Sequence, residues 1–145
     1  MSVSNILTSL NNQVQSTLGQ NWRELDYVYN LENNNFKNAS LGFAVGVKTG
    51  NQVTGTNKSA TVDQVFFVSL TECFVNRYDD AKERQAISNL YDQIDAVTKD
   101  IFQKKLNNDK ILVVQSFDYE EPNNPDESTV ALTVNFIIKY RNNTF

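Results

Sequence analysis

The sequence predicts an α+β protein, in which a mostly antiparallel sheet of about four or five strands is packed by one long helix and a short N-terminal helix. Apolar residues recur at steps of three and four between about residues 79 and 106, and they alternate with polar residues in several shorter stretches. The 145 residues, 40% of them hydrophobic, suit one domain with an ordinary core. We therefore expect residues 1–145 to form a single domain, with a flexible loop or hairpin tip between two strands at about 49–62.

The stretch from Asp79 to Leu106 gives the strongest helix signal. Its large apolar side chains fall on one stripe and charges fill the other face; the stripe comprises Ile87, Leu90, Tyr91, Ile94, Val97, Ile101, Phe102 and Leu106. Asp79 or Asp80 can cap the first N–H groups, and Lys104 and Lys105 lie at the negative end of the helix dipole. A stripe of this length needs a partner surface, so we expect the helix to cover the sheet.

A shorter helix is predicted at the N-terminus, from Ser4 to a stop at Gly19. Its apolar residues again share one side: Ile6, Leu7, Leu10, Val14 and Leu18. The opposite side is rich in Asn, Gln and Ser and is nearly uncharged. Such a helix is marginal alone, so it must dock on the sheet or on a neighbouring subunit.

Alternating patterns predict the strands, at residues 22–31, 41–48, 65–75, 111–119 and 130–140. The second carries only Gly42, Ala44 and Gly46 on one face, which lets another element approach closely. The third begins apolar on both faces, as a central strand does. The last two form a hairpin. In the fourth, strict alternation puts Ile111, Val113, Gln115, Phe117 and Tyr119 on the face opposite Leu112, Val114, Ser116 and Asp118.

Composition disfavours several classes of function. The chain has no histidine and one cysteine, so the commonest general base and metal ligand are missing and no internal disulfide can form. We predict no catalytic residue, no cofactor and no metal site. The net charge of -4 disfavours a protein that grips nucleic acid by its phosphates. Because we find neither a signal peptide nor a long apolar run, we expect no membrane partner and synthesis in the cytoplasm.

Individual motifs favour structural interpretations over chemistry. The segment at residues 50–59 resembles a phosphate loop, but Thr56 and Asn57 separate Gly55 from Lys58, and a strand follows. Cys73 is expected to be a buried structural thiol. Core or interface packing is the expected role of three aromatic residues, Trp22, Tyr27 and Tyr29.

Acidic residues raise two further questions. Glu83, Asp92, Asp95 and Asp100 lie on the polar side of the long helix, where solvated carboxylates are the rule, and no second acidic cluster converges on them. The segment from Glu120 to Ser128 holds both prolines and is predicted to be an acidic turn. Its carboxylates are either solvated or a contact for a basic partner.

The order of these elements resembles the tail terminator (tail completion) proteins of long-tailed bacteriophages. The resemblance covers most of the chain and rests on five features in sequence: the helix ending at Leu18, the segment Glu32-Asn-Asn-Asn-Phe36, the strand Val65-Phe-Phe-Val-Ser-Leu70, the helix from Asp79, and the closing strand Val134-Asn-Phe-Ile-Ile-Lys-Tyr140-Arg141. It implies a virion structural protein without catalytic residues. Such a protein forms a ring, usually a hexamer, that caps the head-proximal end of the tail tube, stops its polymerisation and joins it to the head connector.

In that interpretation two polar segments are the expected protein contacts, because the first is long and lacks a core of its own. The contact residues are Lys48, Thr49, Gly50, Asn51, Gln52, Thr54, Gly55, Asn57 and Lys58 in the first segment, and Glu120, Glu121, Asp126 and Glu127 in the second. The expected partners are other copies of the chain, the tail tube protein and a head-tail connector or head-closure protein. Genome DNA would pass through the ring without specific binding.

Two alternatives stay open. Within the same class, the protein could be another neck component, such as a head-closure or connector adaptor. From a different class, it could be a small ligand-binding or enzymatic α+β domain with an acidic pocket.

Overall fold

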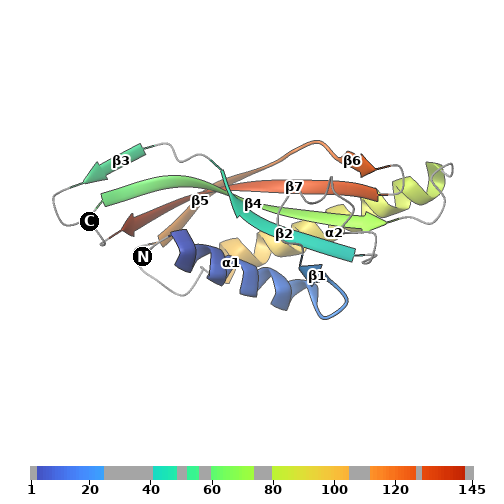
Figure 1. Cartoon of the computed structure of the whole chain (residues 1–145), viewed down its shortest axis with the longest axis horizontal. Coiled ribbons are helices and arrows are strands. Elements are labelled where there is room, and N and C mark those ends of the chain that lie inside the picture. Colours follow the sequence, from blue (N-terminus) through green and yellow to red (C-terminus); the bar gives the residue numbers. More distant parts are fainter. Residues whose placement is uncertain are drawn as a thin grey trace.

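Figure 1 shows the computed structural model of the chain, which describes residues 3–24, 41–48, 52–55, 60–73, 80–104, 112–126 and 129–142. The elements in order are α1 (Val3–Leu18), β1 (Arg23–Glu24), β2 (Leu41–Val47), β3 (Gln52–Gly55), β4 (Ala60–Cys73), α2 (Asp80–Lys104), β5 (Leu112–Tyr119), β6 (Asn123–Asp126) and β7 (Thr129–Asn142). The predicted α+β class, with a mostly antiparallel sheet and two helices, is confirmed.

The sheet is built around two long central strands. Within the described residues its order is β1-β2-β4-β7-β5, with β3 paired to β4 and β6 paired to β7. The strands β4 and β7 have 14 residues each and pair antiparallel along their full length. The pair of β1 and β2 is parallel, and the other pairs are antiparallel. The predictions of a central strand and a final hairpin are confirmed.

Both helices lie on the same face of this sheet (Figure 1). The long helix α2 packs on β7, β4 and β5, while α1 packs on β2 and against α2. The core fills the space between, and its largest fully buried side chains are Phe43, Phe66, Phe136, Ile6, Leu10, Leu70, Leu90, Ile94, Ile101 and Leu132. These are the positions that the helical and alternating patterns predict. We call this side the helix-covered face and the opposite side the helix-free face.

The predicted docking of α1 is confirmed, and hydrogen bonds show how it is fixed. The Asp100 carboxylate on α2 accepts hydrogen bonds from the Gln13 amide at 3.0 Å and from the Thr17 hydroxyl at 2.9 Å. Gly19 follows the helix with φ of 92°, the left-handed conformation that suits glycine after a helix end. The Trp22 side chain then packs in the core with 7% exposed.

One predicted strand is described only at its start, and two predicted loops contain strands. Of the strand predicted at 22–31, the structure shows only Arg23–Glu24, and residues 25–31 lie outside the described ranges. The segment predicted at about 49–62 as a flexible loop or hairpin tip contains a hairpin, in which β3 pairs with the start of β4 from Gln52–Asp63 to Gly55–Ala60. β-Branched residues at 53–54 and 61–62 favour this short hairpin. Likewise, the acidic turn contains β6, which pairs with the start of β7.

The strand β5 also differs from the prediction, in which of its side chains face the helices. The register of β5 on β7 shifts between Val114 and Ser116, so one residue is inserted in the strand. As a result, Val114 and Phe117 both face the helices, although strict alternation puts them on opposite sides. The bulge thereby brings Phe117 and Tyr119 next to α2.

Candidate interaction surfaces

The two predicted contact segments lie at opposite ends of the sheet. The strand β3 pairs with β4 around Asp63, whereas β6 pairs with β7 around Ala131, whose partner on β4 is Thr71. From Asp63 to Thr71 a strand advances roughly 26 Å. Figure 1 shows β3 and β6 at the two ends of the molecule. Of the predicted contacts, Gln52, Thr54, Gly55 and Asp126 lie in these strands, and Thr49, Gly50, Asn51, Asn57, Lys58 and Glu127 lie outside the described residues.

Among the predicted contacts that the structure describes, Lys48 and Glu120 come together in the middle of the molecule. The Lys48 ammonium lies 3.1 Å from a Glu120 carboxylate oxygen, and both side chains are over 40% exposed. The strands β2 and β5, which these residues follow, are separated in the sheet by β4 and β7. The ion pair therefore spans the helix-free face, and we call it the Lys48–Glu120 bridge. An exposed pair of this kind contributes about 0–1 kcal/mol.

A close aromatic contact lies under this bridge. The Lys48 ammonium is 5.8 Å from the centre of the Phe67 ring. The ring in turn lies over Gly46, its register partner on β2, so that a Cβ at Gly46 would be 2.3 Å from the ring carbon Cζ. The small side of β2 that the sequence predicts to allow close approach is therefore filled by Phe67 from the next strand.

The acidic residues of α2 serve as anchors. Besides Asp100, Asp95 accepts a hydrogen bond from the Tyr119 hydroxyl at 2.7 Å, and Glu83 accepts one from the Asn124 amide at 3.3 Å. These carboxylates hold α2 to α1, β5 and β6 respectively. The expectation that they are simply solvated is therefore incomplete for these three. No group of three or more metal-ligating side chains forms among the described residues.

An exposed aromatic surface runs along β5, and sequence reasoning did not identify it. Phe117 is 45% exposed and Tyr119 is 38% exposed. Their rings pack on each other and on Phe102 and Tyr91 of α2, with centroid distances of 5.0 to 6.3 Å. Burial and the hydrogen bond to Asp95 raise the pKa of Tyr119. Exposed aromatic residues on an edge strand are typical of protein interfaces.

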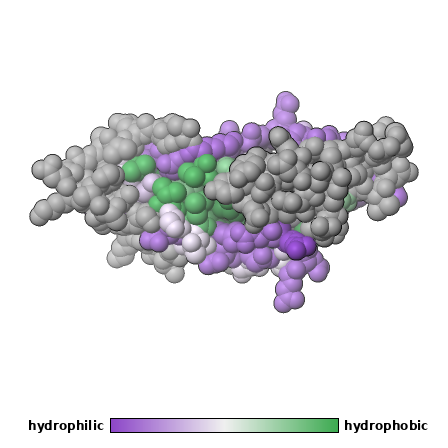
Figure 2. Space-filling view, viewed as in Figure 1, coloured by the Kyte–Doolittle hydropathy of each residue, from purple (hydrophilic) through white to green (hydrophobic). Residues whose placement is uncertain are grey.

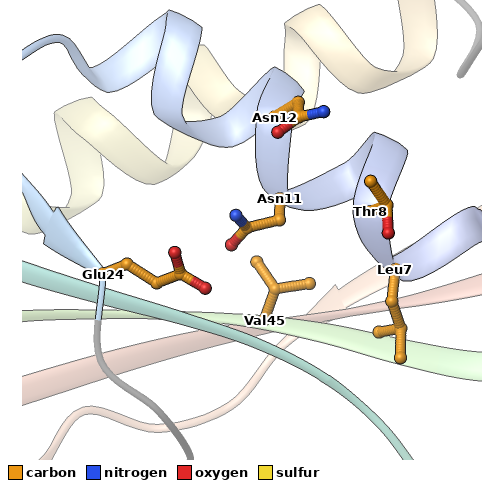
Figure 3. Close-up of a pocket in the computed structure, with 6 residues that line it drawn as sticks. All are labelled: Leu7, Thr8, Asn11, Asn12, Glu24 and Val45. Carbon is orange, nitrogen blue, oxygen red and sulfur yellow. The ribbon is translucent and has the colours of Figure 1, made fainter. Parts of the chain in front are cut away.

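A groove lies at the opposite edge of the sheet, between α1 and β2. It has a volume of about 250 Å³ and is lined by Leu7, Thr8, Asn11, Asn12, Glu24 and Val45. Figure 3 shows the side chains of Asn11 and Glu24 directed toward each other above Val45. We call it the edge groove. Figure 2 shows an apolar area left of centre, with hydrophilic surface above it.

A second groove of about 190 Å³ is lined by Trp22, Leu41, Glu72, Asn89, Asp92 and Gln93. Burial raises the pKa of Glu72, and a hydrogen bond with Asn89 partly offsets that effect. The groove has acidic and amide side chains but no basic one among its described lining residues. Cys73, by contrast, is only partly buried at the end of β4, with its sulfur 3.3 Å from the Thr129 hydroxyl.

Neither α1 nor α2 combines the length and apolar character of a membrane-crossing helix within the described residues. Comparison with known proteins gives no match, either to a protein-family model or to a curated protein.

Proposed function

We propose that the protein is a virion structural component that caps the head-proximal end of a phage tail tube as a ring, ends tube polymerisation and provides the joint to the head connector. The observation that carries the proposal is the placement of the two predicted contact segments at opposite ends of the sheet, at β3 and β6. A joint between two different assemblies requires two separate contact surfaces. The rigid pair of β4 and β7 supports both.

The two ends differ in sequence character. The segment around β3 is rich in Gly, Thr and Asn, whereas the segment at β6 carries Glu121, Asp126 and Glu127, and Glu120 just before them pairs with Lys48. Glu120 and Glu121 are exposed. Because acidic surfaces attract basic partners, the β6 end is suited to a basic surface and the β3 end to a polar, nearly neutral one.

The mechanism would be geometric. A terminator ring offers the last tube ring a surface like that of another tube ring, while its far side lacks that surface, so no further subunit adds. A ring forms when a heterologous contact between copies closes by rotation. The runner-up function, another neck component, would use the same two ends but would not stop tube growth.

The decisive experiment is negative-stain microscopy of the protein mixed with purified tail-tube subunits, with tube lengths recorded with and without the protein. Rings at tube ends and halted elongation are the expected result. Tubes that grow unaffected, without density at their ends, would contradict the proposal. Joining to heads without an effect on tube length would favour the neck adaptor.

Two variants test which end of the sheet contacts the tail tube and which end contacts the head connector. Replacing residues 56–59 with Gly and Ser changes the connection between β3 and β4 while keeping both strands, and Glu121→Lys reverses a charge near β6. One variant should lose tube capping, and the other should cap tubes but fail to join heads. Circular dichroism of both proteins controls for folding. If both variants cap tubes and join heads, the two-ended assignment is wrong.

A further inference from the structure

The exposed large apolar side chains of the described residues lie on the two edges of the sheet. Phe117 and Tyr119 are on β5, and Val47, 40% exposed, is on β2. All three side chains point to the helix-covered face, because their register partners are buried there. Phe117 pairs with Phe136, and Val47 pairs with Phe66. The two edges therefore present apolar surface on the same side of the sheet.

The register of strand pairing aligns the exposed residues of the two edges in one row across the sheet. Val47 is opposite Phe66, Phe66 is opposite Phe136, and Phe136 is opposite Phe117. A single row thus crosses the sheet from one exposed edge residue to the other. A second copy placed beside the first can continue this row without changing which side chains face the helices.

The backbone of both edges is open within the described residues. The strand β5 pairs with β7 alone, and β1 covers β2 only at Gly42 and Phe43. Among the residues that the structure describes, none pairs with residues 44–47 on that side. Since β2, β4, β7 and β5 alternate in direction, β5 of one copy runs antiparallel to β2 of a copy beside it. An edge strand of this kind is a template for pairing with another chain.

We infer that copies of this chain associate head to tail, with β5 of one copy pairing to residues 44–47 of β2 in the next. We call this the edge contact. Continuing the row puts Phe117 opposite Val47 of the neighbour, and antiparallel pairing then puts Tyr119 opposite Val45. The occupant of the aromatic edge is thus a second copy.

The edge groove lies beside the position that the exposed side of a neighbour's Tyr119, 38% exposed, takes in this contact. Val45 lines this groove, so a neighbour's Tyr119 opposite Val45 stands at its mouth. The Tyr119 hydroxyl stays bonded to Asp95 of its own chain, so the exposed part of the ring would face the apolar Leu7 and Val45 side chains of the neighbour's groove. Amphipathic aromatic anchors in such pockets are typical of interface centres.

Charge on the other face agrees with this register. Asp118 is exposed and would lie opposite Gly46 of the neighbour, diagonal to the neighbour's Lys48. Opposite charges at diagonal positions on one face of a sheet attract. The inferred neighbour therefore meets an apolar match on the helix-covered face, while on the helix-free face Asp118 adds a second carboxylate near a Lys48 that already pairs with Glu120 of its own chain.

The edge contact rests on the proposed function, because it would be the contact between neighbouring subunits of the proposed ring. It is heterologous, because the two edges are different surfaces, and such contacts close into rings when the rotation fits. It can be tested by cross-linking, whereas tube capping is measured by microscopy. Cross-linking without capping would overturn the function and keep the contact, and capping without cross-linking would do the reverse.

The test uses single-cysteine variants in a Cys73→Ser background. Val47→Cys and Phe117→Cys proteins are oxidised separately and as a mixture, both alone at high concentration and with tail-tube subunits. The mixture should give a disulfide-linked dimer several-fold more abundant than either protein alone. The double variant should give a ladder of covalent multimers, since its two cysteines lie on opposite edges of one chain.

The matched control is a mixture of the Asp118→Cys and Val47→Cys proteins. Asp118 is next to Phe117 in the strand but points to the opposite face of the sheet, so its cysteine should not meet the one at position 47 in the inferred register. The control mixture should cross-link several-fold less than the Phe117→Cys mixture. Equal cross-linking of both mixtures, or none in any condition, would overturn the edge contact. Cross-linking of Phe117→Cys protein mainly with itself would also overturn it, because that indicates a two-fold contact.

Discussion

The two faces of the sheet use the same strands for different purposes. On β7, Phe136 and Ile138 point to the helix-covered face and are fully buried. Between them Ile137, and before them Asn135, point to the helix-free face and remain partly exposed. The helix-covered face therefore carries most of the stabilising burial, while the helix-free face is held by small residues, Phe67 over Gly46, and an ion pair.

A small protein can in this way keep one surface free to interact. Burial of large apolar side chains contributes about 1.5–3 kcal/mol for each side chain, so one well-filled face can stabilise the whole domain. The other face and the two edges are then under weaker packing constraints. They hold the exposed features of interest, among them the Lys48–Glu120 bridge and the aromatic edge.

The largest expected effect comes from making the same substitution at two adjacent positions of β7, one on each face of the sheet. Ile138→Ala removes side-chain atoms from the filled core and should lower the free energy of unfolding by about 2–5 kcal/mol. Ile137→Ala removes the same atoms from the helix-free face, where the side chain is partly exposed, and should cost less than half as much. Urea unfolding of both variants measures the difference. Equal losses would mean that the helix-free face is packed as tightly as the core.

The core could be predicted from the sequence because its periodicity is local. The stripe containing Leu90, Ile94 and Ile101 follows the helical repeat, and the alternation of Val134, Phe136 and Ile138 follows the strand repeat. Each pattern fixes the buried side of its own element. For that reason the helix, the central strand and the final hairpin were predictable without knowledge of their neighbours.

The candidate surfaces depend on pairing between distant segments, and periodicity does not report pairing. The residues of the Lys48–Glu120 bridge are 72 positions apart. Phe117 faces α2 because of one inserted residue in β5, and strict alternation gives no sign of such an insertion. Likewise, β3 and β6 lie at opposite ends only because of where they pair on β4 and β7.

A smaller effect is expected within the helix-free face, at Gly46. In Gly46→Ala the new methyl group would meet the Phe67 ring, so the ring must move, and the variant should lose about 1–3 kcal/mol of stability, as overpacked sites do. In a Phe67→Ala background the same substitution should cost little, because the obstacle is gone. Chemical unfolding of the four proteins in this cycle gives the coupling energy. Additive effects would show that Phe67 does not restrict Gly46.

The smallest expected effect lies at Glu72, a charged residue on the helix-covered side of β4. Burial raises its pKa above the usual 4.5, so the folded protein holds this proton more tightly than the unfolded chain does. Stability must then fall as pH rises from about 4.5 through the raised pKa, and the loss persists at pH 7. Glu72→Gln keeps an oxygen for Asn89 and removes the charge, so it should be more stable than the parent at pH 7.

Because the Glu72 side chain is only partly buried, water screens the effect and the gain should be under about 1 kcal/mol. Below pH 4, where the parent carboxyl is protonated, the gain should vanish. Glu121→Gln, at an exposed carboxylate, is the matched control and should change the free energy of unfolding little at pH 7. Urea unfolding at both pH values separates the cases. A loss of stability in Glu72→Gln at pH 7 would mean that the folded protein favours the charged carboxylate, and that the second groove stabilises negative charge.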